Sequence, residues 1–301
     1  MSLPRWPGKR CSEGCDDRDS KRERTGDEHG CDEEEKGSIS STLDIADADL
    51  DSFWRTLQRD GVCSLENVLT QQFIGNALEF VHSLSPCVRY GGLRVEFSIS
   101  RKEECFSVTS LLHHGLLSSL LEKALGKDFR LLRIGGIMSF PGAEDQPVHR
   151  DGQPLFSKVE LGALALRAAC RRDGEMNLEN SDSCNASSSC ALPPHAVHVW
   201  LPICSNYTEV SGATNFYLGS HRSFGEVFED LPAEERKMYP KVQPIISPGS
   251  ALIFDDRVFH YGGANLSTHA RTCIFYSFAR PFYTDGTREQ DRDTTGWTEI
   301  E

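Results

Sequence analysis

The chain has 301 residues, of which 38% are hydrophobic and 26% are charged. This composition is that of an ordinary soluble protein, and the length fits one large domain or two small ones. Acidic residues outnumber basic ones by 45 to 32, and the net charge of −13 argues against nucleic acid or an anionic membrane surface as the main partner.

No sequence signal directs the chain out of the cytoplasm. No run approaches the roughly 20 apolar residues of a membrane helix, and the first residues lack the apolar core of a signal peptide. The last residues, Trp297 to Glu301, do not form a peroxisomal Ser-Lys-Leu ending. The 11 Cys residues are odd in number and irregularly spaced, which favours free thiols. A cytoplasmic protein is expected, with an oligomeric state that the sequence leaves open.

The first 40 residues differ in composition from the rest. Charged side chains dominate them, and they contain too few apolar residues to offset the entropy cost of ordering. We predict a disordered tail over residues 1–40, one domain over residues 41–290, and a short C-terminal tail over residues 291–301. Cys11, Cys15, Cys31 and His29 match no known zinc spacing, so a zinc site in the tail is disfavoured.

Three helices are predicted at the start of the domain. Apolar residues recur at three- and four-residue intervals over residues 47–60, which end at Gly61, and over residues 70–84. A third helix is predicted over residues 116–125. Between the first two helices, residues 62–65 favour a short strand.

The period then changes from helical to extended. Short apolar runs separated by Gly and Pro turns predict strands over residues 131–140, 197–203, 214–218, 242–246, 251–254 and 272–278. Several short strands behind a helical front indicate an α+β protein built on a β-sandwich or barrel.

A polar stretch over residues 170–195 interrupts the strands and is predicted to be a long surface insertion. It contains Cys170, Cys184, Cys190 and His195, which make a second zinc candidate. Because these residues lack paired Cys-x-x-Cys spacing, a polar loop is the favoured interpretation.

The sharpest local motif is His149-Arg150-Asp151. Side chains at i and i+2 of an extended segment point to the same side, so the imidazole and the carboxylate can meet at one point. Such a pair also occurs by chance. Its context is more informative, since His260 follows an apolar run 109 residues after Asp151, and Arg271 opens the next predicted strand.

Two His and one carboxylate bind one face of Fe(II) and leave three positions open. A bidentate 2-oxo acid and dioxygen can occupy those positions. An Arg on a neighbouring strand can supply the planar fork that binds a distal carboxylate.

On these residues the sequence resembles the phytanoyl-CoA dioxygenase family of Fe(II)/2-oxoglutarate-dependent oxygenases. The matching segments stand in the family's order over about residues 41–283, and together they are more specific than any one alone. They are residues 58–69, Gln146-Pro147-Val148-His149-Arg150-Asp151-Gly152, residues 198–203, residues 211–215, Gly219-Ser220-His221-Arg222, and Pro248 through His260 to Arg271.

The resemblance implies a double-stranded β-helix, or jelly roll, flanked by N-terminal helices. It implies that His149, Asp151 and His260 are the iron ligands. Arg271 corresponds to the residue that holds the 5-carboxylate of 2-oxoglutarate, and Trp200 to an aromatic that lines the co-substrate pocket. The implied cofactors are Fe(II), 2-oxoglutarate and dioxygen, with ascorbate as an auxiliary reductant. In related halogenases a small residue replaces the carboxylate, so Asp151 favours oxygen transfer over halogenation.

The chain departs from the family pattern in two places. Leu218 stands where Pro usually precedes Gly-Ser-His, and Cys273 stands where a small hydroxyl residue often follows the Arg. The first change affects one turn, and the second puts one hydrogen bond to the co-substrate in doubt.

Other candidates have simpler interpretations. His221 is expected to hold a turn, His269 to be a solvated rival of His260, and Arg280 to lie at a strand end as a rival of Arg271. Aromatic residues near the motifs are expected in the core rather than in a pocket. They are Phe140, Phe156, Phe275 and Tyr276.

We therefore predict a dioxygenase that hydroxylates a small organic or lipid-like substrate and converts 2-oxoglutarate to succinate. Two alternatives remain open. One is hydroxylation of a protein or amino-acid side chain by the same chemistry, and the other is a jelly-roll binding module without turnover. The sequence does not identify the substrate.

Overall fold

The helices at the start of the domain follow the apolar spacing of the sequence. The computed structural model describes residues 44–84, 92–152, 155, 192–284 and 296–298. Within these ranges the three predicted helices are confirmed, although α1 starts at Asp44 rather than Asp47. The first helices are α1 (Asp44–Asp60), α2 (Gln71–Leu84), α3 (Val108–Leu112) and α4 (Gly115–Leu125). Gly61 ends α1 in a left-handed conformation with φ of 80°.

Two antiparallel sheets carry the rest of the fold. The larger has the order β1-β7-β4-β9-β3-β2-β10, and the smaller has the order β6-β5-β8. The strands of the larger sheet are β1 (Val62–Leu65), β7 (Ala251–Asp255), β4 (Ala196–Pro202), β9 (Arg271–Ala279), β3 (Arg130–Ser139), β2 (Arg94–Ser98) and β10 (Gly296–Thr298). Those of the smaller sheet are β6 (Lys241–Val242), β5 (Thr214–Tyr217) and β8 (His260–Gly262). The short elements η2 (Glu104–Phe106), η4 (Ser220–Arg222) and α6 (Ala233–Lys237) connect them.

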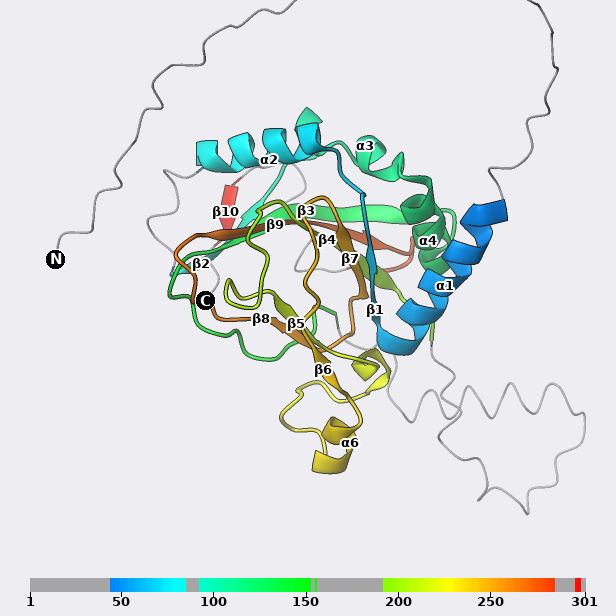
Figure 1. The fold of residues 1–301 in the computed structure, drawn as a ribbon. Coiled ribbons are helices and arrows are strands. Elements are labelled where there is room, and N and C mark those ends of the chain that lie inside the picture. The colour runs from blue at the N-terminus through cyan, green and yellow to red at the C-terminus, as the bar shows by residue number, and fades with distance from the viewer. Residues whose placement is uncertain (1–43, 85–91, 153–154, 156–191, 285–295, 299–301) are drawn as a thin grey trace, which may run out of the picture. The chain divides into compact units, whose positions relative to one another are not determined.

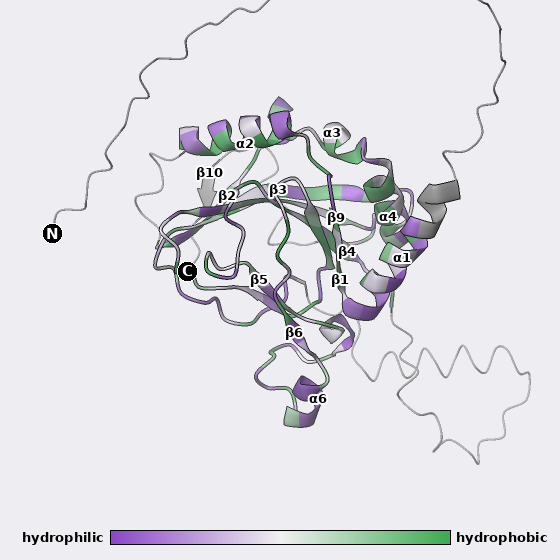
Figure 2. Ribbon diagram, in the orientation of Figure 1, coloured by the Kyte–Doolittle hydropathy of each residue, from purple (hydrophilic) through white to green (hydrophobic). Residues whose placement is uncertain are grey.

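The N-terminal helices and the small sheet lie on opposite sides of the large sheet, and α6 lies beside the small sheet (Figure 1). This arrangement confirms the predicted α+β jelly roll with N-terminal helices. Figure 2 shows hydrophobic and hydrophilic residues mixed along α2 and α4, as expected for helices with one face on a sheet.

Period-two alternation sorts the side chains of the large sheet into two layers. On β9, the side chains of Ile274, Tyr276 and Phe278 join the core beneath the helices. Their neighbours in the sequence lie on the other face of the sheet, where Phe275 and Ser277 line a cavity. The same division holds on β4, where Val197, Val199 and Leu201 are in the helix-side core, and His198 and Trp200 line a cavity on the other side.

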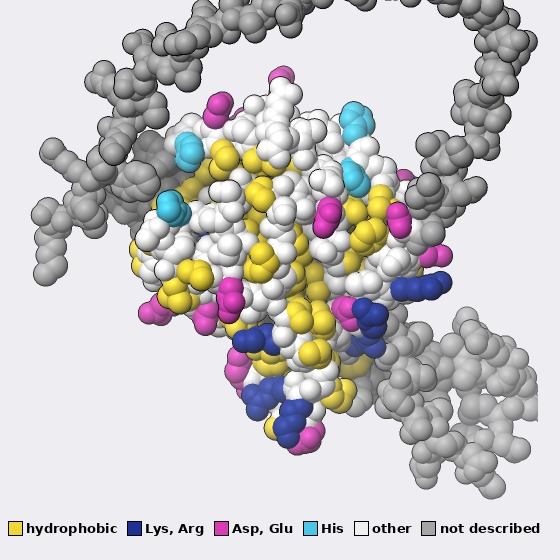
Figure 3. Space-filling view, viewed as in Figure 1, with side chains coloured by type: hydrophobic (Ala, Val, Ile, Leu, Met, Phe, Trp, Pro, Cys, Tyr) yellow, Lys and Arg dark blue, Asp and Glu magenta, His cyan; other side chains and the backbone are white. Residues whose placement is uncertain are grey.

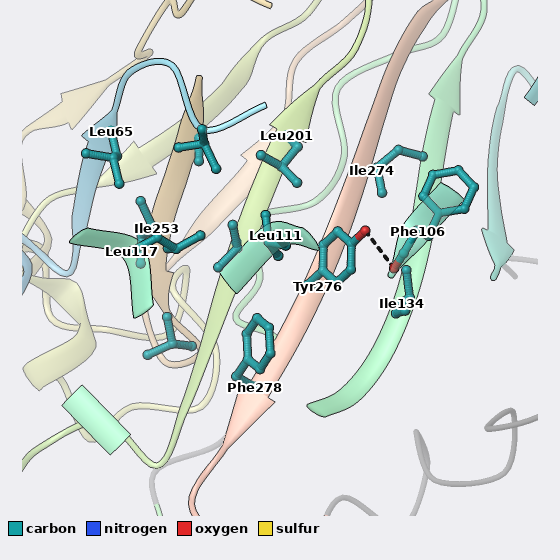
Figure 4. Packing of buried hydrophobic residues seen from close by; sticks show 14 of the residues in the cluster. Leu65, Phe106, Leu111, Leu117, Ile134, Leu201, Ile253, Ile274, Tyr276 and Phe278 are labelled. Atoms are coloured by element: carbon teal, nitrogen blue, oxygen red, sulfur yellow. Dashed lines mark hydrogen bonds between the residues drawn. The ribbon is translucent and has the colours of Figure 1, made fainter. Parts of the chain in front are cut away.

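The helix-side core is large and almost entirely apolar. Figure 4 shows Tyr276 and Phe278 of β9 packed with Leu201 of β4 and with Leu111 and Leu117 of the helices. The hydroxyl of Tyr276 donates to the main-chain oxygen of Phe106 at 3.1 Å, which satisfies this otherwise buried polar group.

Two adjacent glycines of β3 make room for aromatic rings on the two faces of the sheet. A Cβ on Gly136 would overlap the ring of Phe97 on the helix side, and a Cβ on Gly135 would crowd the ring of Phe275 on the cavity side. Phe97 is fully buried and has no space to withdraw. Gly135 and Gly136 are therefore required by the packing of side chains from neighbouring strands.

Gly136→Ala is expected to lower the free energy of unfolding by about 1–3 kcal/mol, because it overpacks a filled core. Gly75→Ala is the matched control. It lies within α2 and its new Cβ would meet nothing within 4 Å, so it is expected to stabilise by about 0.5–1 kcal/mol. Denaturant unfolding of both variants measures the difference. Equal stabilities would contradict the packing role of Gly136.

The strand predictions need correction at four places. Of residues 242–246, only Val242 is in a strand, the two-residue β6, because Pro244 has no N–H to continue a ladder. Strands β2, β8 and β10 were not predicted, although β8 contains His260. Strand β10 lies within the predicted C-terminal tail and pairs with β2. The other predicted strands are present, and each of their ends lies within one residue of the prediction.

Two predicted segments fall outside the described residues: the tail over residues 1–40, and residues 170–191 of the polar insertion. His195 is described, and it is buried at the start of β4. Within the described ranges the cysteines are free thiols, as predicted; they are Cys63, Cys105, Cys204 and Cys273.

The described helices include none that is both long and apolar enough to cross a bilayer. On the face shown in Figure 3, basic and acidic side chains are interspersed around the lobe formed by α6 and β6. Lys237 and Glu234 of α6, for example, form an exposed ion pair at 2.8 Å.

Candidate functional site

The three predicted metal ligands meet between the two sheets. His149, on the loop after β3, pairs with His260 of β8 through two main-chain hydrogen bonds of 2.9 and 2.8 Å. This pairing holds the two imidazole rings 4.6 Å apart, centroid to centroid. Asp151 reaches the same point, with Oδ2 3.6 Å from His260 Nε2. One potential ligand atom from each of the three residues lies within 4.8 Å of the others.

Both histidines have the same backbone partner two residues earlier in the chain. His149 Nδ1 lies 2.8 Å from the oxygen of Pro147, and His260 Nδ1 lies 3.0 Å from the oxygen of Val258. A carbonyl oxygen accepts only, so each Nδ1 carries the proton and each Nε2 presents a lone pair. The two rings are therefore oriented and protonated as metal ligands usually are.

Burial keeps His260 neutral. The ring is 6% exposed, and desolvation lowers its pKa to about 4, against the opposing influence of Asp151. At neutral pH the Nε2 lone pair is therefore available for a metal ion without loss of a proton.

Arg150, between His149 and Asp151, points the opposite way. Its guanidinium lies 3.8 Å from the centroid of the Phe259 ring and donates to the main-chain oxygen of Ser223 at 3.2 Å. Burial and the like charge of Arg257 lower its pKa to about 10. By anchoring the loop on its far side, Arg150 keeps the flanking His and Asp side chains directed to the site.

A cavity of about 370 Å³ opens beside the three residues. Arg271 and Trp200 both line it, and both come from the cavity-facing side of the large sheet. Arg271 is 1% exposed, and its Nη1 donates to the main-chain oxygen of Gly212 at 2.7 Å. The structure thus brings the predicted Arg and Trp into one cavity with the His-Asp-His group.

The charge around Arg271 suits an anion. Arg94 donates to the main-chain oxygen of Gly263 at 2.7 Å, and burial together with the nearby charge of Arg271 lowers the pKa of Arg94 to about 10. Among the described residues, two buried donors of the cavity wall have no hydrogen-bond partner, Arg271 Nε and Arg133 Nε. Unpaired buried donors beside two cations are what a bound carboxylate would satisfy.

Several cavity residues escaped the sequence analysis. Arg133 and Glu96 form an ion pair across β3 and β2, and the Arg133 guanidinium lies 5.2 Å from the centroid of the Phe275 ring. Phe275 in turn stacks on Trp200 with centroids 5.8 Å apart and planes 6° from parallel. Phe275 was predicted to be a core residue, and this is wrong, because the alternation of β9 turns it to the cavity.

His198 is the most informative residue that was missed. It lines the cavity two residues before Trp200 on β4, and its Nε2 lies 2.6 Å from Asp256 Oδ1 and 3.3 Å from Asp151 Oδ2. Its place on the same strand face as Trp200 was the available signal. No sequence signal indicated Asp256, because it follows β7 in a turn.

The rival histidines and Arg280 lie away from the site. His221 is buried against Gly61, with Nε2 3.2 Å from the oxygen of Gln58, so it holds a turn as predicted. His269 is exposed beside Thr268. Arg280 donates to the oxygens of Pro194 and Ala124 at the other end of β9 from Arg271.

Two further sequence predictions have clear outcomes. Tyr276 is in the core as predicted. Cys273 is fully buried, and burial raises the pKa of its thiol to about 12, so the thiol stays protonated. Phe156 lies outside the described residues.

Comparison with known proteins gives a consistent picture. The model of the phytanoyl-CoA dioxygenase family matches residues 57–273, most of the chain. A curated relative, the dioxygenase FrzG of a Cladobotryum species, is 27% identical over 180 residues. That alignment covers 58% of this chain and spans half the length of the relative.

Solved structures support the fold. The 2-oxoglutarate-dependent epimerase SnoN from nogalamycin biosynthesis, solved with Fe³⁺, 2-oxoglutarate and a nogalamycin ligand, aligns with a TM-score of 0.56 at 15% identity, covering 78% of this chain and 84% of that one. HygX from Streptomyces hygroscopicus, solved with nickel, 2-oxoglutarate and hygromycin B, aligns with a TM-score of 0.55 at 14% identity, covering 81% and 92%.

Proposed function

The chain belongs to the phytanoyl-CoA dioxygenase family of Fe(II)/2-oxoglutarate-dependent enzymes, and from this membership we propose that it hydroxylates a small organic molecule at the His149, Asp151 and His260 centre. The observation that carries the proposal is the convergence of these three side chains beside the buried guanidinium of Arg271.

The donor set fits ferrous iron. Two neutral imidazole nitrogens and one carboxylate oxygen on one side of the ion leave the remaining positions open to other ligands. When bound, iron and 2-oxoglutarate supply the activation of dioxygen, with release of succinate and CO₂. Ascorbate has the role of an auxiliary reductant.

The protein residues bind and orient the reactants. Arg271 holds the distal carboxylate of 2-oxoglutarate, which fixes the co-substrate in one direction along the cavity. The stacked rings of Trp200 and Phe275 form an apolar wall next to it. Because Asp151 occupies the carboxylate position of the ligand set, the position that a halide takes in related halogenases is filled.

A small molecule is the favoured substrate class. The cavity of about 370 Å³ is lined by both apolar rings and polar groups, which suits a compact organic ligand. SnoN was solved with nogalamycin RO and HygX with hygromycin B, both organic molecules. Hydroxylation of a protein side chain remains the alternative within the same chemistry.

Metal binding by two histidine variants tests the proposal. His260→Ala is expected to weaken Fe(II) or Mn(II) binding by more than about 100-fold, since loss of a ligand must exceed the effect of losing an outer-shell partner. His269→Ala removes an exposed histidine nine positions away and is expected to bind metal as the wild type does. Calorimetric titration under anaerobic conditions gives both affinities.

Turnover assays complete the test. The wild-type protein with Fe(II) is expected to convert 2-oxoglutarate to succinate in air, whereas His260→Ala is not. Equal metal affinity in His260→Ala and His269→Ala would rule out the ligand assignment. Metal binding without any succinate formation would favour a binding module instead of an enzyme.

A further inference from the structure

A row of buried polar side chains lies directly behind Asp151. His198 is 4% exposed, and Asp256 is fully buried. His198 Nε2 contacts both carboxylates, at 2.6 Å from Asp256 Oδ1 and 3.3 Å from Asp151 Oδ2. Its other nitrogen, Nδ1, lies 2.8 Å from the hydroxyl oxygen of Ser277 on β9. The row therefore connects the proposed metal-binding carboxylate to the interior of the large sheet.

The hydrogen bonds define the tautomer of His198. Two carboxylate oxygens face Nε2, and both are acceptors, so Nε2 must carry a proton. The Ser277 hydroxyl can then donate to the lone pair on Nδ1. This is the reverse of His149 and His260, whose Nδ1 atoms carry the proton and whose Nε2 atoms are free to bind metal.

The tautomer of His198 distinguishes two roles for this residue, a metal ligand and a hydrogen-bond donor. Asp151, His198 and Asp256 also lie close enough together to form a second metal-binding group that shares Asp151 with the first. A histidine that carries its proton on the nitrogen facing the carboxylates has no lone pair to offer there. The geometry thus favours a hydrogen-bond donor over a second metal ligand.

Asp256 is itself fixed to the loop that carries Asp151. Its main-chain oxygen accepts from the amide of Gly152 at 2.8 Å, and its carboxylate lies where a Cβ of residue 152 would be. The hydroxyl of Tyr283 lies 3.4 Å from Asp256 Oδ2, whereas His195 Nε2, at 3.7 Å from the same oxygen, is too far away to form a hydrogen bond with it. Asp256 is therefore a rigid anchor for His198.

We propose that His198 is a positioning residue whose Nε2–H, fixed by Asp256, holds the carboxylate of Asp151 in place at the metal site. Asp256 and Ser277 fix the ring of His198 from its two sides. One metal ion binds per chain, and His198 is not a ligand. This inference rests on the proposed function, because it assumes that Asp151 binds the metal.

Variants at position 198 test the role by Mn(II) affinity, measured by electron paramagnetic resonance without 2-oxoglutarate. His198→Leu removes the donor and is expected to weaken binding by about 10- to 100-fold. His198→Gln keeps an N–H donor of similar reach and is expected to restore the affinity to within about threefold of wild type. The wild type is expected to bind one Mn(II).

His195→Leu is the matched control, since His195 is also a buried histidine but lies beside Asp256 rather than Asp151. Its Mn(II) affinity is expected to stay close to that of the wild type. Equal losses in His195→Leu and His198→Leu would show general damage to the core and would overturn the proposal. Binding of two Mn(II) ions per chain would overturn it too.

The tautomer of His198 can be measured in the wild-type protein, so the result does not depend on the folding of a variant. In metal-free protein labelled with ¹⁵N-histidine, long-range NMR correlations distinguish Nε2–H from Nδ1–H rings, and His198→Gln assigns the His198 signals. We expect Nε2–H for His198 and Nδ1–H for His149 and His260. An Nδ1–H ring at His198 would contradict the inference.

The outcome separates this inference from the proposed function. If His260→Ala abolishes Mn(II) binding and His198→Leu leaves it unchanged, the metal centre stands and the positioning role fails. If His260→Ala has no effect, the proposed metal centre fails, and the positioning role fails with it.

Discussion

Replacement of Asp151 by alanine is expected to abolish succinate formation, with a loss of at least about 1000-fold. The carboxylate is the only anionic member of the proposed ligand set, so its removal takes away both a ligand and the charge that balances the metal ion. Loss of an outer-shell partner alone costs about 10- to 100-fold in affinity or activity, and a direct ligand must contribute more. Succinate measured after incubation with Fe(II), 2-oxoglutarate and air gives the result.

Asp145→Ala is the control on the same loop. The Asp145 carboxylate accepts from the amide of Ala264 at 2.6 Å and is not part of the cavity wall. This variant is expected to lose about 0.5–1.5 kcal/mol of stability, the usual contribution of one hydrogen bond, while keeping its turnover. Asp151→Ala with turnover within tenfold of wild type would show that Asp151 is not a metal ligand.

The convergence of the proposed site follows from strand alternation combined with sheet pairing. Trp200 on β4 and Phe275 on β9 are paired across the ladder, so the same alternation that places their neighbours in the helix-side core turns both rings to the cavity. The β8 pairing of His260 with His149 then closes the site from the small sheet. A cavity wall and a core wall thus arise from the same strands.

Local sequence patterns made part of the fold and part of the proposed site predictable. The first helices have clear three- and four-residue spacing, and His149 and Asp151 are two residues apart, so their common direction can be read from the sequence alone. His260 and Arg271 are distant from them, and only the order of several motifs connected them to the pair.

Non-local contacts account for what was missed. Strand β2 alternates polar and apolar residues from Arg94 to Ser98, but a five-residue alternation also occurs by chance, and its meaning depends on pairing with β3. The contacts of His198 with Asp256 bridge 58 residues of sequence, and no local period indicates such a contact. Phe275 reads as a core residue until the glycine opposite it, Gly135, is seen to leave space for its ring.

Arg271→Ala is expected to raise the KM for 2-oxoglutarate by about 100-fold or more while leaving metal affinity unchanged. Two charge-assisted hydrogen bonds to a carboxylate contribute about 1.5–3 kcal/mol each, and each 1.4 kcal/mol is a factor of ten. Arg271→Lys keeps the charge but loses the planar fork, so an intermediate KM is expected. Because Arg271 is not a proposed ligand, this pattern differs from that of Asp151→Ala, which should lose metal binding as well.

Arg280→Ala is the matched control at the opposite end of β9. Arg280 donates to two main-chain oxygens there, so its loss is expected to lower stability and leave the KM for 2-oxoglutarate near the wild-type value. A second readout is independent of folding yield. Wild-type protein should strongly prefer 2-oxoglutarate over 2-oxopentanoate, which lacks the distal carboxylate, and Arg271→Ala should lose most of this preference. If the preference is as strong in Arg271→Ala as in the wild type, another residue binds the distal carboxylate. Arg133 on the same cavity wall, whose Nε has no hydrogen-bond partner, then becomes the first residue to test.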